Sequence, residues 1–322
     1  MRFDYALRTA AAVIALAAGP ALPAHATYLI TEFARPGAAS TSLFDVNNSG
    51  VMVGYSFAST DSLPIGFAYD GSTFTSLTGP AGAVGANALG ISDGGTVVGV
   101  YYTSMEGPAN AFVYSAGSYT TFSIAGATDT RLRAISPDGR YISGYYSTAA
   151  ALGVGFVYDL LSETLSIVST PDSLLTIAQG INSSYTLVGS DIMAGSPITR
   201  PGFTYDIASG VRTDASIVGA RRTALRAIDD AGVLAGWFTD AGGSTHGFVG
   251  STASYEQIDV PGAIATYAEG SNNAGVIVGN FDLDGSGFFS AFVARPVAVP
   301  EPGTLGLLAL GLLGGGLTRR RR

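Results

Sequence analysis

The sequence predicts an all-β fold, a β-propeller of six four-stranded blades with about 45 residues each. Two anchors repeat along the chain with a common period. The first is the glycine that ends a Val-Val-Gly-like core, found at Gly54, Gly99, Gly144, Gly189, Gly236 and Gly279. The second is the phenylalanine of a Gly/Ala-Phe pair, found at Phe67, Phe112, Phe156, Phe203, Phe248 and Phe292. Because two independent anchors keep one period, chance composition is excluded, and a solenoid, propeller or array is indicated.

Within one repeat the pattern is that of short β-strands. In the second repeat we expect strands at 87–91, 97–102, 110–114 and 119–124, because these runs are rich in β-branched and aromatic residues. The first turn, at 92–95, is Ser-Asp-Gly-Gly, and such residues tolerate the positive φ angles of a tight hairpin. Four antiparallel strands in about 45 residues match a propeller blade.

The two ends of the repeat array predict how it closes. The sixth repeat has no fourth strand after 291–294, whereas the segment 28–33, before the first repeat, aligns with the fourth strand of the other repeats. We expect this N-terminal strand to pair beside 291–294 and to complete the sixth blade, which leaves no long strand edge unpaired.

The chain divides into three parts. Residues 1–26 have the features of a secretory signal peptide, with Arg2 and Arg8 before a short apolar run and the small-x-small site Ala24-His25-Ala26. A retained N-terminal helix is the alternative, but it leaves that site unexplained. Residues 27–298 are the repeat domain, and residues 299–322 form a separate tail.

The tail has three successive features. Pro300, Glu301 and Pro302 come first, an uncharged stretch at 303–318 follows, and the cluster Arg319, Arg320, Arg321 and Arg322 ends the chain. As a helix the uncharged stretch is about 24 Å long, a marginal span for a hydrocarbon core of roughly 30 Å. We therefore expect one hydrophobic transmembrane helix, with its arginines on the cytoplasmic side of the inner membrane.

This order of features resembles the PEP-CTERM sorting signal, and the match covers only the tail. The resemblance implies an exosortase-type enzyme as the partner that removes the tail, in Gram-negative bacteria that make exopolysaccharide. It also implies a protein anchored in the cell envelope until processing, and then located at the cell surface or outside the cell. An ordinary tail anchor is the alternative.

The repeats resemble the HAF family of extracellular repeat proteins. The closest parts are Val46–Tyr55, His246-Gly247-Phe248 and Pro261-Gly262-Ala263, and the histidine of the family pattern is replaced in the other repeats. The resemblance extends from about residue 28 to 295. It implies fold and location, and it implies no catalytic residue.

Composition excludes several classes of function. Residues 27–300 contain 10 arginines and 22 acidic residues, so their net charge is −12, which argues against general binding to nucleic acid or to an anionic membrane. The chain has no cysteine, so disulfides cannot stabilise it.

We expect no catalytic residue, no cofactor and no metal ion. Ser92 lies in a match to the G-x-S-x-G nucleophile motif, but it lies in a hairpin turn, and His246 is the only histidine after residue 26. Asp282 and Asp284 begin like a calcium loop, yet Val293 stands where the bidentate glutamate is needed. We expect a hairpin tip there, and we leave calcium binding open.

The sequence predicts an exported protein of the cell surface or extracellular matrix. We expect it to be a binding or structural component associated with exopolysaccharide, and not an enzyme. Variable loops on a regular scaffold are where function concentrates. Arginine suits acidic sugars, and the candidate ligand contacts are Arg131, Arg133, Arg221 and Arg222.

Three alternatives stay open. The arginines could simply pair with neighbouring aspartates. The protein could be a propeller-type lyase or hydrolase acting on glycans, or a purely structural coat component without a ligand. The ligand, the oligomeric state and release from the cell are not encoded in any motif that we recognise.

Overall fold

In the computed structural model, the described residues are 27–59, 62–104, 106–194 and 199–297. The predicted signal peptide, the predicted C-terminal helix and the sorting residues Pro300, Glu301, Pro302 and Arg319–Arg322 lie outside them. Contacts separate a compact unit, Tyr28–Pro296, from a second unit made of both chain ends. In the part of the chain that the structure describes, all regular elements are strands, and no helix is long and apolar enough to cross a membrane.

Four sheets of the compact unit have four strands each, in sequence order. The first holds β2 (Ser40–Val46), β3 (Met52–Phe57), β4 (Ile65–Tyr69) and β5 (Phe74–Leu77). The second holds β6 (Gly85–Ile91), β7 (Val97–Tyr102), β8 (Asn110–Ser115) and β9 (Ser118–Phe122). The third holds β10 (Asp129–Ile135), β11 (Tyr141–Ser147), β12 (Val154–Asp159) and β13 (Thr164–Ile167). The fourth holds β14 (Ser173–Ile181), β15 (Thr186–Met193), β16 (Gly202–Asp206) and β17 (Val211–Asp214).

The fifth sheet has eight strands. It holds β18 (Arg222–Ile228), β19 (Leu234–Thr239), β20 (Thr245–Gly250), β21 (Tyr255–Ile258), β22 (Ala265–Ser271), β23 (Ile277–Asp282), β24 (Ser290–Val297) and β1 (Thr27–Phe33). A single parallel pair, Thr245 with Ala265, joins β20 to β22 and so merges the strands of the last two repeats.

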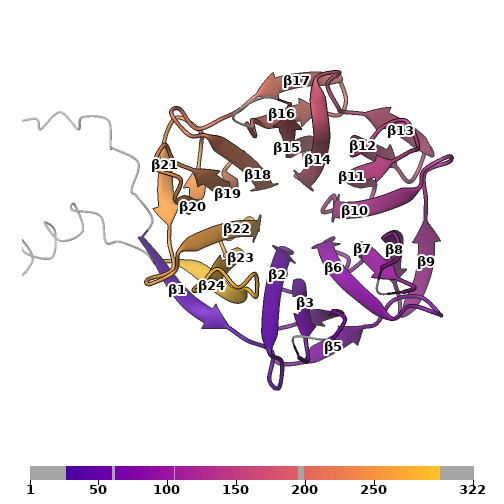
Figure 1. The fold of residues 1–322 in the computed structure, drawn as a ribbon, viewed down its shortest axis with the longest axis horizontal. Coiled ribbons are helices and arrows are strands. Elements are labelled where there is room, and N and C mark those ends of the chain that lie inside the picture. The colour runs from indigo at the N-terminus through magenta and orange to yellow at the C-terminus, as the bar shows by residue number, and fades with distance from the viewer. Residues whose placement is uncertain (1–26, 60–61, 105, 195–198, 298–322) are drawn as a thin grey trace, which may run out of the picture. The chain divides into compact units, whose positions relative to one another are not determined.

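The prediction of six separate four-stranded blades is therefore wrong. The described residues form a β-propeller with four separate four-stranded blades, and the last two repeats share one eight-stranded sheet. A sequence period counts repeating units, but it does not show whether neighbouring units also hydrogen-bond to each other. Figure 1 shows the sheets arranged around a central axis, with β2, β6, β10, β14, β18 and β22 innermost.

The two sequence anchors lie opposite each other in every repeat. Gly54 pairs with Phe67, and Gly99 pairs with Phe112, in adjacent antiparallel strands. The six anchor phenylalanines are fully buried. A Cβ added at Gly54 would lie 1.9 Å from the Ser42 carbonyl oxygen, so no larger residue fits there. The repeating glycine is thus required because its strand lies against the backbone of the innermost strand.

Apolar clusters lie between neighbouring sheets. One joins Val53 and Leu77 of the first sheet to Ala86, Ala88 and Phe112 of the second. Another packs Leu43 and Phe67 of the first sheet against Val278, Ala291 and Val293 of the last, which closes the ring. Stability of the ring therefore depends on contacts between sheets as well as on the ladders within them.

Strand β1 lies next to β24, as predicted for the segment 28–33. Tyr28 and Ile30 pack against the core cluster of the last sheet, and Phe33 packs against the cluster that joins the last sheet to the first. The ring of Phe33 lies 5.3 Å from that of Tyr69, between ring centroids. The N-terminal strand therefore covers the edge of β24 and also supports the closing contact.

Deleting residues 28–33 is expected to lower the melting temperature sharply, because it removes these apolar contacts and exposes the edge of β24. Phe33→Ala alone should lower it by roughly 4–8 °C, from a loss of about 2 kcal/mol. Thermal unfolding followed by circular dichroism measures both. Leu29→Ala is the matched control, since Leu29 is 61% exposed. An unchanged melt after the deletion would mean that β1 does not close the ring.

Candidate functional site

Each innermost strand carries a β-bulge at the same place. The register breaks one residue after the position that pairs with the anchor glycine, for example between Leu43 and Asp45 and between Leu132 and Ala134. A bulge turns one extra side chain away from the ladder. The bulged residues, which we call the axial ring, are Phe44, Leu89, Arg133, Gln179, Arg226 and Glu269.

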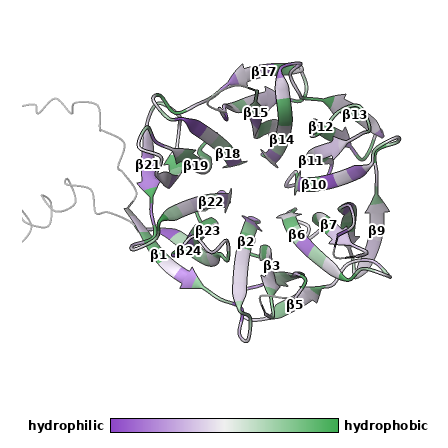
Figure 2. Cartoon of the chain, viewed as in Figure 1, coloured by the Kyte–Doolittle hydropathy of each residue, from purple (hydrophilic) through white to green (hydrophobic). Residues whose placement is uncertain are grey.

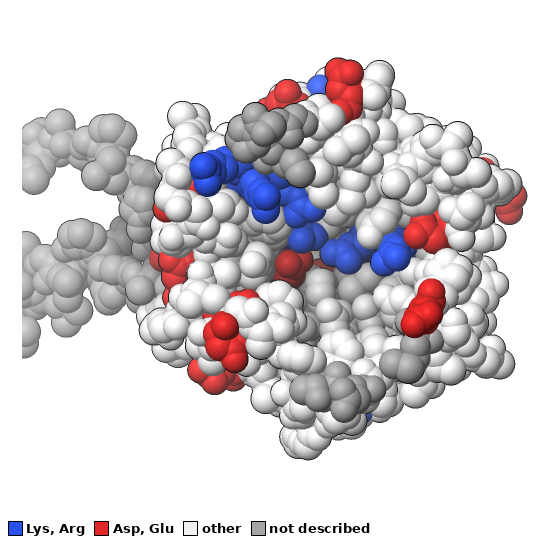
Figure 3. Space-filling view, in the orientation of Figure 1, with Lys and Arg blue, Asp and Glu red and all other residues white. Residues whose placement is uncertain are grey.

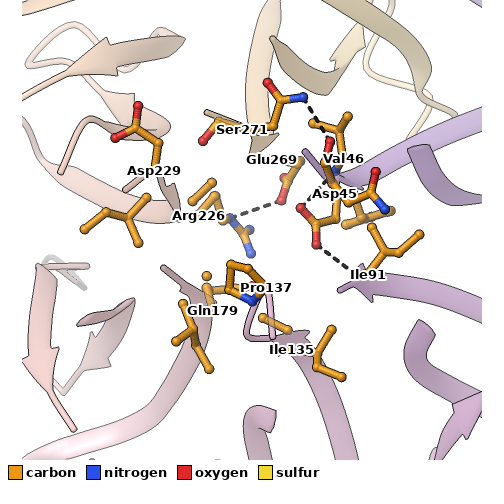
Figure 4. A pocket seen from close by; sticks show the side chains of 18 of the residues that line it. Asp45, Val46, Ile91, Ile135, Pro137, Gln179, Arg226, Asp229, Glu269 and Ser271 are labelled. Carbon is orange, nitrogen blue, oxygen red and sulfur yellow. Dashed lines mark hydrogen bonds and ion pairs between the residues drawn. The ribbon is translucent and has the colours of Figure 1, made fainter. Parts of the chain in front are cut away.

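The axial ring lines a narrow cavity of about 60 Å³. All six of its members border this cavity, together with residues of the hairpin turns that follow the innermost strands. Figure 4 shows Arg226 and Glu269 pointing toward each other across this opening. The bulges therefore bring side chains from all the innermost strands to one place.

The residue after each bulge is small in every innermost strand except one. A Cβ added at Gly90 would lie 2.8 Å from the Ala134 Cα, and one added at Gly180 would lie 2.9 Å from the Ala227 Cα. Neighbouring innermost strands thus approach too closely for side chains there. The exception is Asp45, whose Cα lies 2.7 Å from the Cβ position of Gly270.

Asp45 is partly buried in this crowded position. Its carboxylate accepts hydrogen bonds from the backbone N–H of Val46, at 2.8 Å, and of Ile91, at 2.9 Å (Figure 4). Burial raises the pKa of Asp45 to about 6, although these two backbone N–H groups act in the opposite direction. The pKa of Asp45 therefore lies well above the usual range of an aspartate.

A wider cavity of about 340 Å³ lies on the other side of the axial ring. We call it the axial chamber. It shares three ring residues, Phe44, Arg226 and Glu269, with the narrow cavity. Its other lining residues are Ser42, Tyr55, Trp237, Tyr267, Asn280 and Phe289.

Aromatic rings form much of the wall of the axial chamber. Phe44 stacks on Tyr55 with ring centroids 5.3 Å apart. Tyr267 contacts Trp237 edge-on at 5.5 Å and Phe289 edge-on at 5.7 Å. Trp237 is 6% exposed, and its Nε1 has no hydrogen-bond partner among the described residues.

Arg226 lines the same chamber, and Arg200 and Arg133 lie next to its aromatic wall. Arg226 forms one ion pair, with Glu269 at 3.3 Å, and its Nε makes no hydrogen bond within the described ranges. The guanidinium carbons of Arg200 and Arg226 lie 5.2 and 5.7 Å from the centre of the Trp237 ring. Arg133 hydrogen-bonds the Gln179 side chain at 3.3 Å.

This crowding of positive charge affects the arginines themselves. Burial, together with the nearby charge of Arg226, lowers the pKa of Arg200 to about 10. Arg222 and Arg133 act in the same direction, and Glu269 opposes them. Burial likewise lowers the pKa of Arg226. The cations near the chamber thus exceed the anion that faces them.

On one face of the molecule the basic residues form a band, which we call the basic arc. Figure 3 shows these side chains running from the rim into the hollowed centre, and Figure 2 shows strongly hydrophilic residues on β10 and β18. The arc is defined by Arg200 and by Arg133, Arg222 and Arg226, whose charges act on it. We include Arg131 and Arg221, which adjoin these residues on β10 and at the start of β18. It lies on a domain whose net charge is negative, so positive charge is concentrated here.

The structure places the four predicted contact residues in two pairs. Arg131 and Arg133 lie on β10, and Arg221 and Arg222 lie exposed at the start of β18. Arg131 forms an ion pair with Asp129 at 3.5 Å. Among the described residues, the other three form no ion pair with an aspartate or glutamate. Pairing with aspartates therefore accounts for Arg131 only.

The sequence analysis did not identify the axial ring. It also did not identify Trp237 and Glu269, which line the chamber, or Arg200, which lies against Trp237. A signal was present in the aligned repeats. The position after the one that faces the anchor glycine reads Phe, Leu, Arg, Gln, Arg and Glu, whereas its neighbours are almost uniformly apolar or small. Such variation at one place in a regular scaffold indicates function rather than packing.

Other candidate motifs have structural roles. The Ser92 Oγ accepts a hydrogen bond from the Thr96 backbone N–H at 3.0 Å, which belongs to the hairpin turn. The Asp282 carboxylate accepts the backbone N–H groups of Asp284 and Gly285 at the β23–β24 hairpin. His246 lies 2.8 Å from the Asp259 carboxylate. No group of three or more potential ligands is placed to hold a metal ion in the described part of the chain.

Comparison with known families identifies the tail. Residues 298–322 match the PEP-CTERM protein-sorting motif, so the sorting signal predicted from the sequence is confirmed. The protein is exported and sorted by an exosortase, and the C-terminal tail anchors it in the membrane before processing. A search of curated proteins gave no match.

Solved structures resemble the compact unit in fold. The gluconolactonase XC5397 from Xanthomonas campestris is 15% identical with a TM-score of 0.50, covering 87% of this chain and 98% of that one. TolB from Acinetobacter baumannii is 13% identical with a TM-score of 0.49, covering 81% of this chain but only 65% of that one. The β-propeller domain of the Trilobed protease from Pyrococcus furiosus is 11% identical with a TM-score of 0.46, covering 82% and 97%. At such identities the likeness concerns the fold alone.

Asp45 predicts a pH dependence of stability. Because folding raises its pKa from the usual 3.8 to about 6, the folded form resists ionisation. The stabilising contribution is therefore present at low pH and lost as the pH rises through about 6. The Asp45→Ala variant lacks this contribution. The unfolding free energy of the wild type relative to the variant should fall by roughly 2 kcal/mol between about pH 4.5 and 7.5.

Urea unfolding of both proteins at the two pH values measures this difference. Asp70→Ala is a control, because Asp70 is exposed and hydrogen bonds lower its pKa. An equal difference between wild type and Asp45→Ala at both pH values would contradict the assignment.

Proposed function

We propose that this exported protein binds an acidic polysaccharide at the cell surface or in the extracellular matrix, and that it does so without transforming its ligand. The basic arc carries the proposal. It concentrates six of the ten arginines of residues 27–300 on one face, against the net charge of the domain. Guanidinium groups pair with carboxylates in a planar, bidentate manner, so such a face suits a polymer that carries carboxylates.

Two further features support this role. The sorting tail leads to an exosortase and export, which gives the protein access to material outside the cell. The similarity of the repeats to HAF proteins and the features of a signal peptide at 1–26 agree with such a location, and we include both in the proposal.

The experiment compares retention of the exported protein on the polysaccharide of the producing cells. Arg221→Gln combined with Arg222→Gln should weaken binding about five- to thirty-fold at low salt, because two exposed charges are lost at about 0.5–1 kcal/mol each. The difference should shrink at moderate salt, since exposed charges are then screened.

The matched control is Arg35→Gln combined with Arg295→Gln. It removes the same number of charges, and neither residue belongs to the basic arc. Arg295 is exposed on β24, and Arg35 lies near Phe67 and Phe74. Equal weakening by both double variants would point to net charge alone, and no retention of the wild type would refute the proposal.

A further inference from the structure

We propose that the axial chamber is the specific part of this surface, and that it binds one hexuronic acid unit, with the carboxylate at the arginines and the sugar ring against the aromatic wall. This inference deepens the proposed function and rests on it for the class of ligand. It adds a site, a ligand unit and the residues that select it.

The charge of the chamber calls for one anion. Arg226 and Glu269 line the chamber and pair with each other. Arg200, against the Trp237 ring, and Arg133, against the Phe44 ring, add two positive charges next to its aromatic wall. Arg226 is almost fully buried, yet a single ion pair is its only bond to a carboxylate among the described residues. Buried charges without full pairing are costly, so a ligand carboxylate would relieve this crowding.

The aromatic wall of the chamber suits a ligand whose anionic group is attached to a sugar ring. Phe44, Tyr55, Trp237, Tyr267 and Phe289 present apolar surface, which a free inorganic anion could not use. The buried Trp237 Nε1 has no partner in the described part of the chain and is a donor suited to a sugar oxygen. The combination of guanidinium groups and aromatic rings therefore suits a sugar acid better than phosphate.

The size of the chamber limits the ligand. Its volume of about 340 Å³ is at the lower end of ligand pockets, which span roughly 300–1,000 Å³. The axial ring narrows the passage behind it to a cavity of about 60 Å³. The chamber thus accommodates a short part of a polymer, whereas the outer arginines of the basic arc would contact the rest of it.

The bulges of the innermost strands place side chains in the chamber. Phe44, Arg226 and Glu269 enter the chamber because their strands bulge where the anchor glycine faces them. The scaffold therefore keeps its glycines and phenylalanines fixed while the axial residues vary between repeats. The residues that would select the ligand therefore occupy different sequence positions from the glycines and phenylalanines that stabilise the fold.

Trp237 provides the measurement, because it is the only tryptophan in the chain. Titration of the exported protein with D-glucuronate or D-galacturonate should change its fluorescence with saturation. D-glucose, acetate and inorganic phosphate at equal concentrations should give much weaker responses. Oligosaccharides released from the native polysaccharide distinguish a unit within a polymer from a free sugar acid.

Arg200→Gln should weaken hexuronate binding tenfold or more, since it removes a charged donor next to Trp237. It should not destabilise the fold, because Arg200 has no carboxylate partner within the described ranges and its removal reduces crowding. Arg226→Gln combined with Glu269→Gln keeps the net charge and should also weaken binding tenfold or more. Arg295→Gln is the control and should bind normally, and melting temperatures test whether each variant is folded.

The inference is overturned if glucose or acetate binds as well as glucuronate, if no sugar acid binds, or if folded Arg200→Gln binds normally. Failure of the proposed function gives a different result. Hexuronate would then bind in an Arg200-dependent manner while the protein is not retained on the polysaccharide. Retention that depends on Arg221 and Arg222 but not on Arg200 would support the proposed function and reject the chamber.

Discussion

The close approach of two backbones at the anchor glycine determines the rest of this structure. A side chain at Gly54 or Gly99 would overlap the carbonyl oxygen of the neighbouring innermost strand, at 1.9 or 2.0 Å from its Cβ. The fully buried anchor phenylalanine pairs with the glycine from the adjacent strand on the other side. The innermost strand bulges at this point, and the bulge turns one residue per strand to the axis. One local constraint, repeated around the ring, therefore creates both the core and the axial ring.

In each innermost strand, positions that pack alike in every repeat lie directly beside one position whose residue type varies between repeats. The position that pairs with the glycine is apolar, the next is the variable axial residue, and the one after it is small because neighbouring strands touch there. Asp45 departs from this rule: two backbone N–H groups bind its carboxylate, and burial raises its pKa despite them. The axial positions thus include two arginines and a glutamate at the centre of a fold without cysteines.

Much of the scaffold could be predicted from the sequence, but the site could not. The period located the strands of the second repeat to within about two residues, and the surplus segment 28–33 predicted the strand beside β24. The period could not show that the Thr245–Ala265 pair merges two repeats into one sheet. A hydrogen bond between two repeats does not alter the residue pattern of either repeat. The candidate arginines were chosen by their place in loops, whereas Arg133 and Arg226 lie in bulges inside strands. A bulge depends on the register between two strands, which a single strand's pattern does not reveal.

We propose that the bulged axial residues form one ligand site with the aromatic wall behind them. A crystal structure of the exported protein with a short uronate oligosaccharide tests it most directly. We expect a carboxylate in contact with the guanidinium groups of Arg200 or Arg226, with its sugar ring against Trp237. An oligosaccharide ordered only at the outer rim, with the axial chamber free of sugar, would contradict it.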